Sequence, residues 1–193
     1  GPVWAGLDLS ARTDLTALVI VGKVDGVWQV QPHFWTPEQG IHDRSKRDRA
    51  PYDVWAKQGH LHTTAGATVD YEIVAQDMAA ILAGLDVQAI AYDRWRIDLL
   101  KKELERVGCD LPLVPGGQGY KDMAPALDAL EAEGLAERRP LAEDARKYAI
   151  HLTNAARIEP LLGFRAEVGA ALAEDIGVEV SRESNGLDLL RRP

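Results

Sequence analysis

Cysteine is almost absent from this sequence, whose 193 residues include only Cys109. A single cysteine excludes an intrachain disulfide and a zinc site built from several thiolates, so we expect a reducing compartment. Long hydrophobic runs are missing too, since no apolar stretch approaches the roughly 20 residues that span a bilayer. The first residues also lack the basic and apolar regions of a signal peptide. We therefore expect neither secretion nor a membrane partner.

Positive charge is in deficit. Lysine and arginine number 22 against 30 aspartates and glutamates, which gives a formal net charge of −8 at pH 7. Such a chain repels polyanions as a whole, so any contact with a nucleic acid has to be local or mediated by a metal ion. With 46% hydrophobic and 27% charged residues, the composition is globular and excludes a disordered or fibrous chain. The length suits one α/β domain or two very small ones, and we expect one.

Three strands are predicted near the N-terminus, over residues 3–9, 15–22 and 27–35. The second is rich in β-branched residues, and the third alternates apolar and polar residues. Asp25-Gly26, between them, is a strong signal for a hairpin turn, so we expect the chain to open with an antiparallel meander. Residues 36–51 are too charged to be core, and we predict a mobile loop or a solvated helix there.

Helices and strands alternate in the next part of the chain. Apolar residues at helical spacing and short apolar runs predict, in order, a helix over 71–85, a strand over 87–92, a helix over 94–107 and a strand over 111–114. A glycine-rich turn and a further helix follow. The remainder, over 141–162 and 165–176, is predicted to be helical.

Two aspartates stand at the carboxyl ends of predicted strands, Asp8 after the first and Asp93 after residues 87–92. In open α/β sheets this edge exposes functional side chains. If the strands are neighbours, the carboxylates converge, and a pair about 4 Å apart repels by roughly 4 kcal/mol at an effective dielectric of about 20. Such a pair shares a proton or holds a cation, and hard oxygen ligands select Mg²⁺ or Mn²⁺. For one isolated aspartate, a turn or a helix cap is the more common role.

The order of elements is typical of a ribonuclease H-like fold, in which helices cover both faces of a mixed sheet. Five strings of residues make the resemblance more specific. In consistent order between Val3 and Leu135, they resemble the nuclease domain of the large terminase subunits of tailed bacteriophages. The strings are GLDLS with DLTAL (6–10 and 14–18), YDVW (52–55), GATVDY (66–71), AYDRW (91–95) and GQGYKDM (117–123).

This resemblance implies a metal-dependent endonuclease that cuts concatemeric double-stranded viral DNA during genome packaging, with two Mg²⁺ or Mn²⁺ ions at its site. Asp8 and Asp93 match the first two metal-binding, catalytic acids of the family. The third acid of the family usually lies in an Arg-Ile-Asp-Pro string. Here the corresponding string is Arg157-Ile158-Glu159-Pro160, so Glu159 is the candidate for the third catalytic and metal-binding acid.

Alternatives remain open for the third acid. Glutamate reaches one methylene further than aspartate, which octahedral Mg²⁺ tolerates only within narrow limits, and Glu159 could instead be a surface acid ahead of a proline. The substitutes are Asp144, Glu174, Asp175 and Asp188. Asp14, a few residues beyond Asp8, could accept a hydrogen bond from a metal-bound water or cap the turn.

The resemblance also sets the expected organisation and partners. We interpret residues 1–2 as the remnant of a cleaved tag, 3–163 as the nuclease domain and 164–193 as a C-terminal helical extension. In the resembled family an ATPase motor domain precedes the nuclease domain, and the small terminase subunit and the portal are further partners. The implied location is the cytoplasm of the host cell.

Contact with DNA has to come from local clusters of basic residues. We predict phosphate contacts for Arg44 and Arg47, and for Arg94, Arg96 and Lys101 beside the second acid. A charged run is more often a solvated face, and only Arg94 and Arg96 are tied by sequence to the acids. The altered third acid motivates an alternative function, a non-catalytic ribonuclease H-like domain that grips DNA or docks on the motor or the portal.

Overall fold

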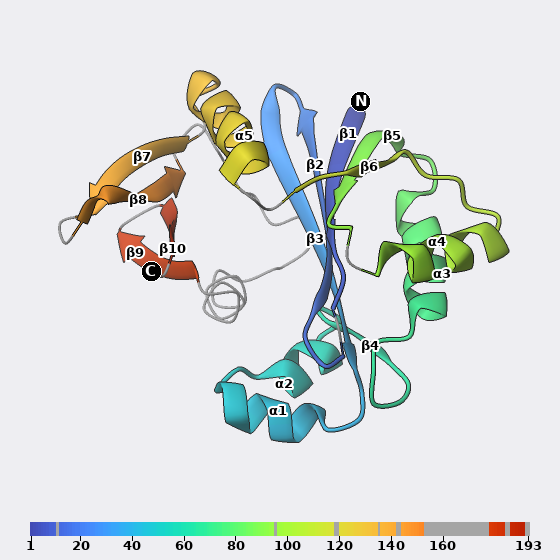
Figure 1. Ribbon diagram of the computed structural model, residues 1–193. Helices are drawn as coiled ribbons and strands as arrows, with labels where there is room; N and C mark the ends of the chain where they lie inside the picture. Colours follow the sequence, from blue (N-terminus) through green and yellow to red (C-terminus); the bar gives the residue numbers. More distant parts are fainter. Residues whose placement is uncertain are drawn as a thin grey trace. The chain divides into compact units, whose positions relative to one another are not determined.

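The computed structural model describes residues 1–10, 12–94, 96–117, 120–134, 136–141, 144–152, 178–183 and 186–191 (Figure 1). The chain divides into two compact units, Gly1–Gln118 and Gly119–Pro193. Each unit contains its own β-sheet. The predicted domain boundary between residues 163 and 164 lies outside the described residues.

A six-stranded mixed sheet forms the centre of the first unit, with the order β4-β3-β2-β1-β5-β6. Its strands are β1 (Pro2–Asp8), β2 (Thr16–Val24), β3 (Val27–Pro37), β4 (His62–Thr64), β5 (Asp86–Tyr92) and β6 (Leu113–Pro115). β1, β2 and β3 are antiparallel neighbours, which confirms the predicted meander. Asp25 and Gly26 have φ angles of 51° and 80°, as a tight hairpin turn requires. β5 runs parallel to β1 and to β6, so the carboxyl ends of these strands lie at one edge.

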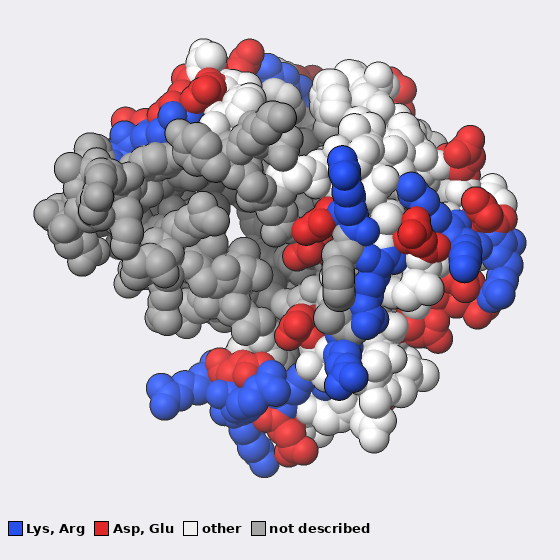
Figure 2. Space-filling view, in the orientation of Figure 1, with Lys and Arg blue, Asp and Glu red and all other residues white. Residues whose placement is uncertain are grey.

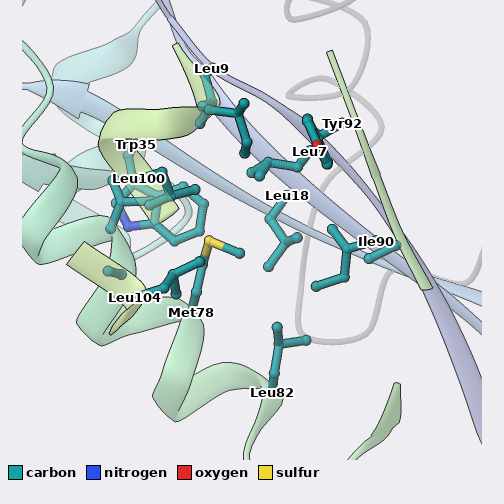
Figure 3. Close-up of a cluster of buried hydrophobic side chains, with 14 of the residues drawn as sticks. Leu7, Leu9, Leu18, Trp35, Met78, Leu82, Ile90, Tyr92, Leu100 and Leu104 are labelled. Atoms are coloured by element: carbon teal, nitrogen blue, oxygen red, sulfur yellow. The ribbon is translucent and has the colours of Figure 1, made fainter. Parts of the chain in front are cut away.

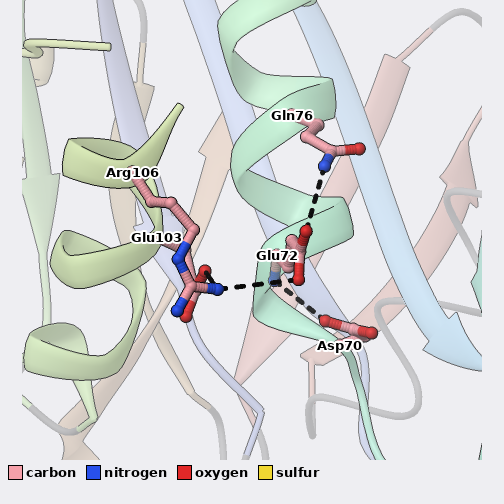
Figure 4. A network of polar contacts seen from close by, with 5 residues as sticks. All are labelled: Asp70, Glu72, Gln76, Glu103 and Arg106. Atoms are coloured by element: carbon pink, nitrogen blue, oxygen red, sulfur yellow. Dashed lines mark hydrogen bonds and ion pairs between the residues drawn. The ribbon is translucent and has the colours of Figure 1, made fainter. Parts of the chain in front are cut away.

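Four helices belong to the described part of this unit: α1 (Ile41–Asp48), α2 (Tyr52–Lys57), α3 (Tyr71–Leu82) and α4 (Ile97–Arg106). The start of α3 is capped by Asp70, whose carboxylate accepts a hydrogen bond from the Glu72 amide at 2.9 Å. Arg106 of α4 pairs with Glu103 at 2.9 Å and with Glu72 at 3.7 Å (Figure 4). Exposed ion pairs of this kind contribute less than about 1 kcal/mol, so apolar packing holds the two helices.

The hydrophobic core lies between the sheet and the helices α3 and α4 (Figure 3). Its side chains without solvent exposure include Leu18, Trp35, Met78, Ile90 and Leu100. Leu7 and Leu18 are cross-strand partners on β1 and β2, and both are buried in this core. Because successive side chains of a strand point to opposite faces, Asp8 belongs to the other face of the sheet.

The second unit contains α5 (Tyr120–Ala132) and a four-stranded sheet in the order β7-β8-β10-β9. Its strands are β7 (Ala136–Leu141), β8 (Asp144–Leu152), β9 (Val178–Glu183) and β10 (Gly186–Arg191), and each hydrogen-bonded pair is antiparallel. No helix within the described residues is both long and apolar enough to cross a membrane.

The second unit corrects two predictions. The helix expected from residue 141 is wrong over 144–152, where β8 forms, and the tail expected to be helical contains β9 and β10. The physical reason is the period of the sequence: apolar residues recur at every second position in Tyr148, Ile150 and Leu152, which is the period of a strand. The remaining predicted helical residues, 153–162 and 165–176, lie outside the described part of the chain.

Candidate functional site

Two acids meet at the carboxyl ends of β1 and β5. The parallel register of these strands pairs Leu7 with Tyr92. Asp8 and Asp93 each come one residue later, so they occupy neighbouring positions at the same edge of the sheet. This confirms the prediction that the sheet brings the two acids together.

The neighbours of Asp8 affect the charge on its carboxylate. Asp8 is an exposed residue of the sheet surface, yet partial burial of its carboxylate raises its pKa above the ordinary 3.8. The negative charge of Asp93 raises the pKa further, and so does the charge of Asp14, while a hydrogen bond with the Leu9 backbone lowers it. A partly desolvated carboxylate that feels two like charges is the environment that a bound cation relieves.

The described residues do not complete a metal site by themselves. No group of three or more histidine, cysteine, aspartate or glutamate side chains within the described part is arranged to hold a metal ion. Glu159, Glu174 and Asp175 lie outside the described residues, and Asp144 and Asp188 belong to β8 and β10 of the second unit. Within the first unit, Asp8 and Asp93 are the two predicted acids that come together, and the metal site itself, like its third acid, stays a prediction.

Hydrogen bonds hold the turn that follows Asp8. The Ser10 amide donates to the Thr16 hydroxyl at 3.0 Å, and the Tyr71 hydroxyl donates to the Ser10 carbonyl at 2.7 Å. Thr16 has no solvent exposure and Ser10 is 6% exposed. The role of these residues could not be predicted from the sequence, because their pairing spans up to 61 positions and has no local signal. The one hint is that Tyr71 and Thr16 both fall within the strings shared with the terminase nucleases.

Basic side chains stand near the carboxyl end of β5. Arg94 and Arg96 are exposed, and Arg96 is the N-cap residue of α4, in the left-handed region with φ 57°. The Lys101 ammonium donates to the Tyr92 hydroxyl at 3.1 Å and lies 4.9 Å from the centre of that ring. Figure 2 shows a row of lysine and arginine side chains beside acidic ones on this unit. The arrangement can therefore balance a negatively charged ligand next to an acidic site.

Arg44, predicted to contact DNA, has a structural role instead. The residue is 7% exposed, and its guanidinium donates to the Gln39 carbonyl at 2.8 Å, to the Thr36 hydroxyl at 3.0 Å and to the Pro37 carbonyl. Part of the predicted charged segment thus forms a helix, α1. Its Arg44 donates hydrogen bonds to backbone carbonyls at and just after the end of β3. By contrast, Arg47 is exposed and pairs with Asp48, so its predicted phosphate contact stays a prediction.

We expect Arg44→Gln to lower the free energy of unfolding by about 2 kcal/mol or more, because buried carbonyls lose charged hydrogen-bond donors. Urea unfolding, followed by circular dichroism, measures this loss. Arg47→Gln is the matched control, from the same helix, and is expected to leave the urea midpoint unchanged. Equal midpoints for the parent and Arg44→Gln would contradict the structural role.

This chain is similar to known proteins in both sequence and structure. The model of one family, terminase large subunit, endonuclease domain, matches residues 2–163. The large terminase subunit of Enterobacteria phage HK97 is 57% identical over 130 residues, which are 67% of this chain and 26% of that protein. The crystal structure of the HK97 bacteriophage large terminase matches with a TM-score of 0.70 at 41% identity, over 98% of this chain and 35% of that one.

The chain thus spans about a quarter to a third of the length of these relatives. Its sheet, with an antiparallel meander followed by parallel strands, and its match to the HK97 structure confirm the predicted ribonuclease H-like fold class. The resemblance drawn from the five strings is confirmed as well, and the chain belongs to the family of terminase large subunit endonuclease domains.

Proposed function

We propose that this chain is a metal-dependent endonuclease that hydrolyses phosphodiester bonds of concatemeric double-stranded viral DNA during genome packaging. One observation carries the proposal: Asp8 and Asp93 meet at the ends of adjacent parallel strands, close enough for the charge of one to raise the pKa of the other. The family to which the chain belongs names the activity, and the two acids supply the chemistry for it.

The donor set fits Mg²⁺ or Mn²⁺. Carboxylate oxygens are the hard ligands that these ions prefer, and a dication offsets the like-charge repulsion that Asp8 experiences. We assign Asp8 and Asp93 as metal ligands and Glu159 as the third. When bound, two such ions supply an activated water and charge stabilisation for the leaving oxygen of a phosphodiester.

The other residues of the site act on the DNA backbone. Arg94 and Arg96 follow Asp93 by one and three residues and are exposed, so they can neutralise phosphates near the scissile bond. Lys101 is held over Tyr92, and its ammonium has further donors for a phosphate. Contacts of this kind position a duplex without reading its sequence, which suits an enzyme with little sequence preference at the site.

The partners follow from the family. We propose that this domain works beside the ATPase motor of a large terminase subunit, together with the small terminase subunit and the portal, in the cytoplasm of the host cell. The chain spans 26% of the length of the HK97 large subunit, which leaves room for a motor elsewhere in a protein of that size.

Cleavage of a supercoiled plasmid tests the proposal. The parent chain, with Mg²⁺ or Mn²⁺, is expected to produce nicked and linear DNA, and EDTA is expected to stop the reaction. Asp8→Ala and Asp93→Ala are expected to be inactive. If the parent binds DNA in a gel-shift assay yet never cuts it with either ion, the domain is a non-catalytic DNA-gripping module. Equal cleavage by the parent and both variants would place the activity elsewhere.

Glu159→Gln identifies the third acid. We expect this change to lower the cleavage rate by about 100-fold or more, because one ligand oxygen loses its charge. The initial rate of plasmid nicking in Mn²⁺ measures the loss. Glu133→Gln, an exposed glutamate just after α5, is the matched control. Full activity of Glu159→Gln would redirect the assignment to Asp144, Glu174, Asp175 or Asp188.

A further inference from the structure

The proposed metal site requires a fixed spacing of its carboxylates, and this spacing depends on the conformation of the turn between β1 and β2. Asp8 ends β1 and Asp14 lies just before β2, and both of their charges belong to the same acidic group. Like charges push these segments apart when no cation is present. Something in the surrounding structure has to oppose that repulsion.

Three hydrogen bonds oppose it, and two of them come from the segment that leads into α3. The Val69 amide donates to the Arg12 carbonyl at 3.4 Å, and the Tyr71 hydroxyl donates to the Ser10 carbonyl at 2.7 Å. The third runs from the Ser10 amide to the buried Thr16 hydroxyl. The turn backbone is thus bonded by two side chains, the Thr16 hydroxyl from the start of β2 and the Tyr71 phenol from α3, and only Tyr71 comes from outside the β1–β2 hairpin.

Tyr71 also reaches the segment that follows the second acid. Burial raises the pKa of its phenol, while the positive charge of Arg96 and a hydrogen bond with Arg96 lower it. The negative charge of Asp8 raises the pKa again. Ser10 lies two residues after Asp8, and Arg96 lies three residues after Asp93. One hydroxyl therefore touches both of the segments that leave the acidic strands.

We propose that Tyr71 is a positioning residue for the metal site, whose hydroxyl links the segments after Asp8 and Asp93 and so fixes the spacing of the two carboxylates. This inference rests on the proposed function, because it assigns Tyr71 a part in the same site. Tyr71 does not itself ligate the metal. Its substitution acts through the placement of the acids, and groups that orient metal ligands in this way change metal affinity by about 10- to 100-fold.

Tyr71→Phe tests the proposal, since it removes the hydroxyl and keeps the ring that packs against the core. Mn²⁺ titration of the 193-residue chain, read as the rise in melting temperature, gives the half-saturating concentration. We expect this concentration to increase about 10-fold in Tyr71→Phe. Plasmid nicking is expected to fall at low Mn²⁺ and to recover at high Mn²⁺, a recovery that a general loss of folding would not give.

Tyr52→Phe is the matched control. Tyr52 is a buried tyrosine of α2, packed edge-on against Trp55 and 4% exposed, and its loss of a hydroxyl is expected to leave the Mn²⁺ response unchanged. A second pair of variants checks the same turn: Thr16→Val removes the acceptor of the Ser10 amide and is expected to weaken Mn²⁺ binding, whereas Thr16→Ser keeps the acceptor and is expected to retain it.

The outcomes separate the two proposals. If the parent and Tyr71→Phe have the same half-saturating Mn²⁺ concentration, the positioning role is wrong and the proposed function stands. The same conclusion follows if Tyr52→Phe changes this concentration as much as Tyr71→Phe does. If the parent neither responds to Mn²⁺ nor cuts DNA, the proposed function fails, and the role of Tyr71 fails with it.

Discussion

We expect Asp8→Asn and Asp93→Asn each to lower the rate of the proposed metal-dependent DNA cleavage by at least about 1000-fold. That factor corresponds to about 4 kcal/mol of lost transition-state stabilisation, which is the order of what a catalytic metal ion supplies. Asparagine keeps the size of aspartate and its place at the sheet edge but loses the charged oxygen that a cation needs. The initial rate of plasmid nicking in Mn²⁺, with Mg²⁺ in parallel, measures the loss.

A control on the same strand separates charge from position. Asp86 begins β5 and Asp93 follows its end, so the two aspartates lie at opposite edges of the sheet. Asp86→Asn removes the same charge and is expected to cut DNA at the parental rate. Parental activity of either Asp8→Asn or Asp93→Asn would rule out that residue as a ligand. Strong loss in Asp86→Asn would mean that overall charge, not the site, controls the rate.

The place of each acid at the end of a strand could be predicted from the sequence because the signals for it are local. Short apolar runs ended on Asp8 and Asp93, and the hairpin signal Asp25-Gly26 fixed the direction of the meander. The pairing of β1 with β5 is not local, because three strands and three helices separate them in the chain. It was expected only from the order of elements, which is typical of a ribonuclease H-like fold. The strings shared with the terminase nucleases added the metal and the reaction, which periodicity cannot supply.

The charged segment 36–51 shows what local reasoning misses. Its composition is typical of a solvated face, yet Arg44 is buried because three backbone and side-chain oxygens around the end of β3 lie within reach of its guanidinium. A charge can be buried when each of its donors finds an acceptor. The sequence does not show which of several neighbouring arginines finds them.

The hydrogen bonds of Tyr71 and the strand β8 were missed for different physical reasons. The bond from Tyr71 to Ser10 joins residues 61 positions apart, and nothing in either local pattern favours the pair. Residues 144–152 carry a strand period, but they also contain alanine, lysine and arginine, which favour helices. There the pairing of β8 with β7 and β10 decided the outcome over local propensity.

Divalent cations are expected to stabilise the parent chain strongly. A ligand at 100 times its dissociation constant adds about 2.7 kcal/mol, which raises the melting temperature of a chain of this length by roughly 5 to 10 °C. Asp8→Asn and Asp93→Asn are expected to lose most of this rise, and Asp86→Asn is expected to keep it. Thermal unfolding in EDTA and in Mn²⁺, followed by circular dichroism, measures the difference.

Without metal, Asp8→Asn is expected to be at least as stable as the parent. The pH dependence of the melting temperature tests the reason. Because the folded-state pKa of Asp8 is raised above 3.8, the folded chain binds this proton more tightly than the unfolded chain does, and ionisation of Asp8 opposes folding. The penalty is absent below pH 3.8, grows as pH rises through the folded-state pKa and is complete above it. In EDTA at pH 7, Asp8→Asn should therefore melt no lower than the parent, and any advantage should vanish as pH falls toward 3.8. A large drop in the melting temperature of Asp8→Asn in EDTA would show that the carboxylate stabilises the fold. A rise in melting temperature with Mn²⁺ equal to that of the parent would show that Asp8 does not hold the ion.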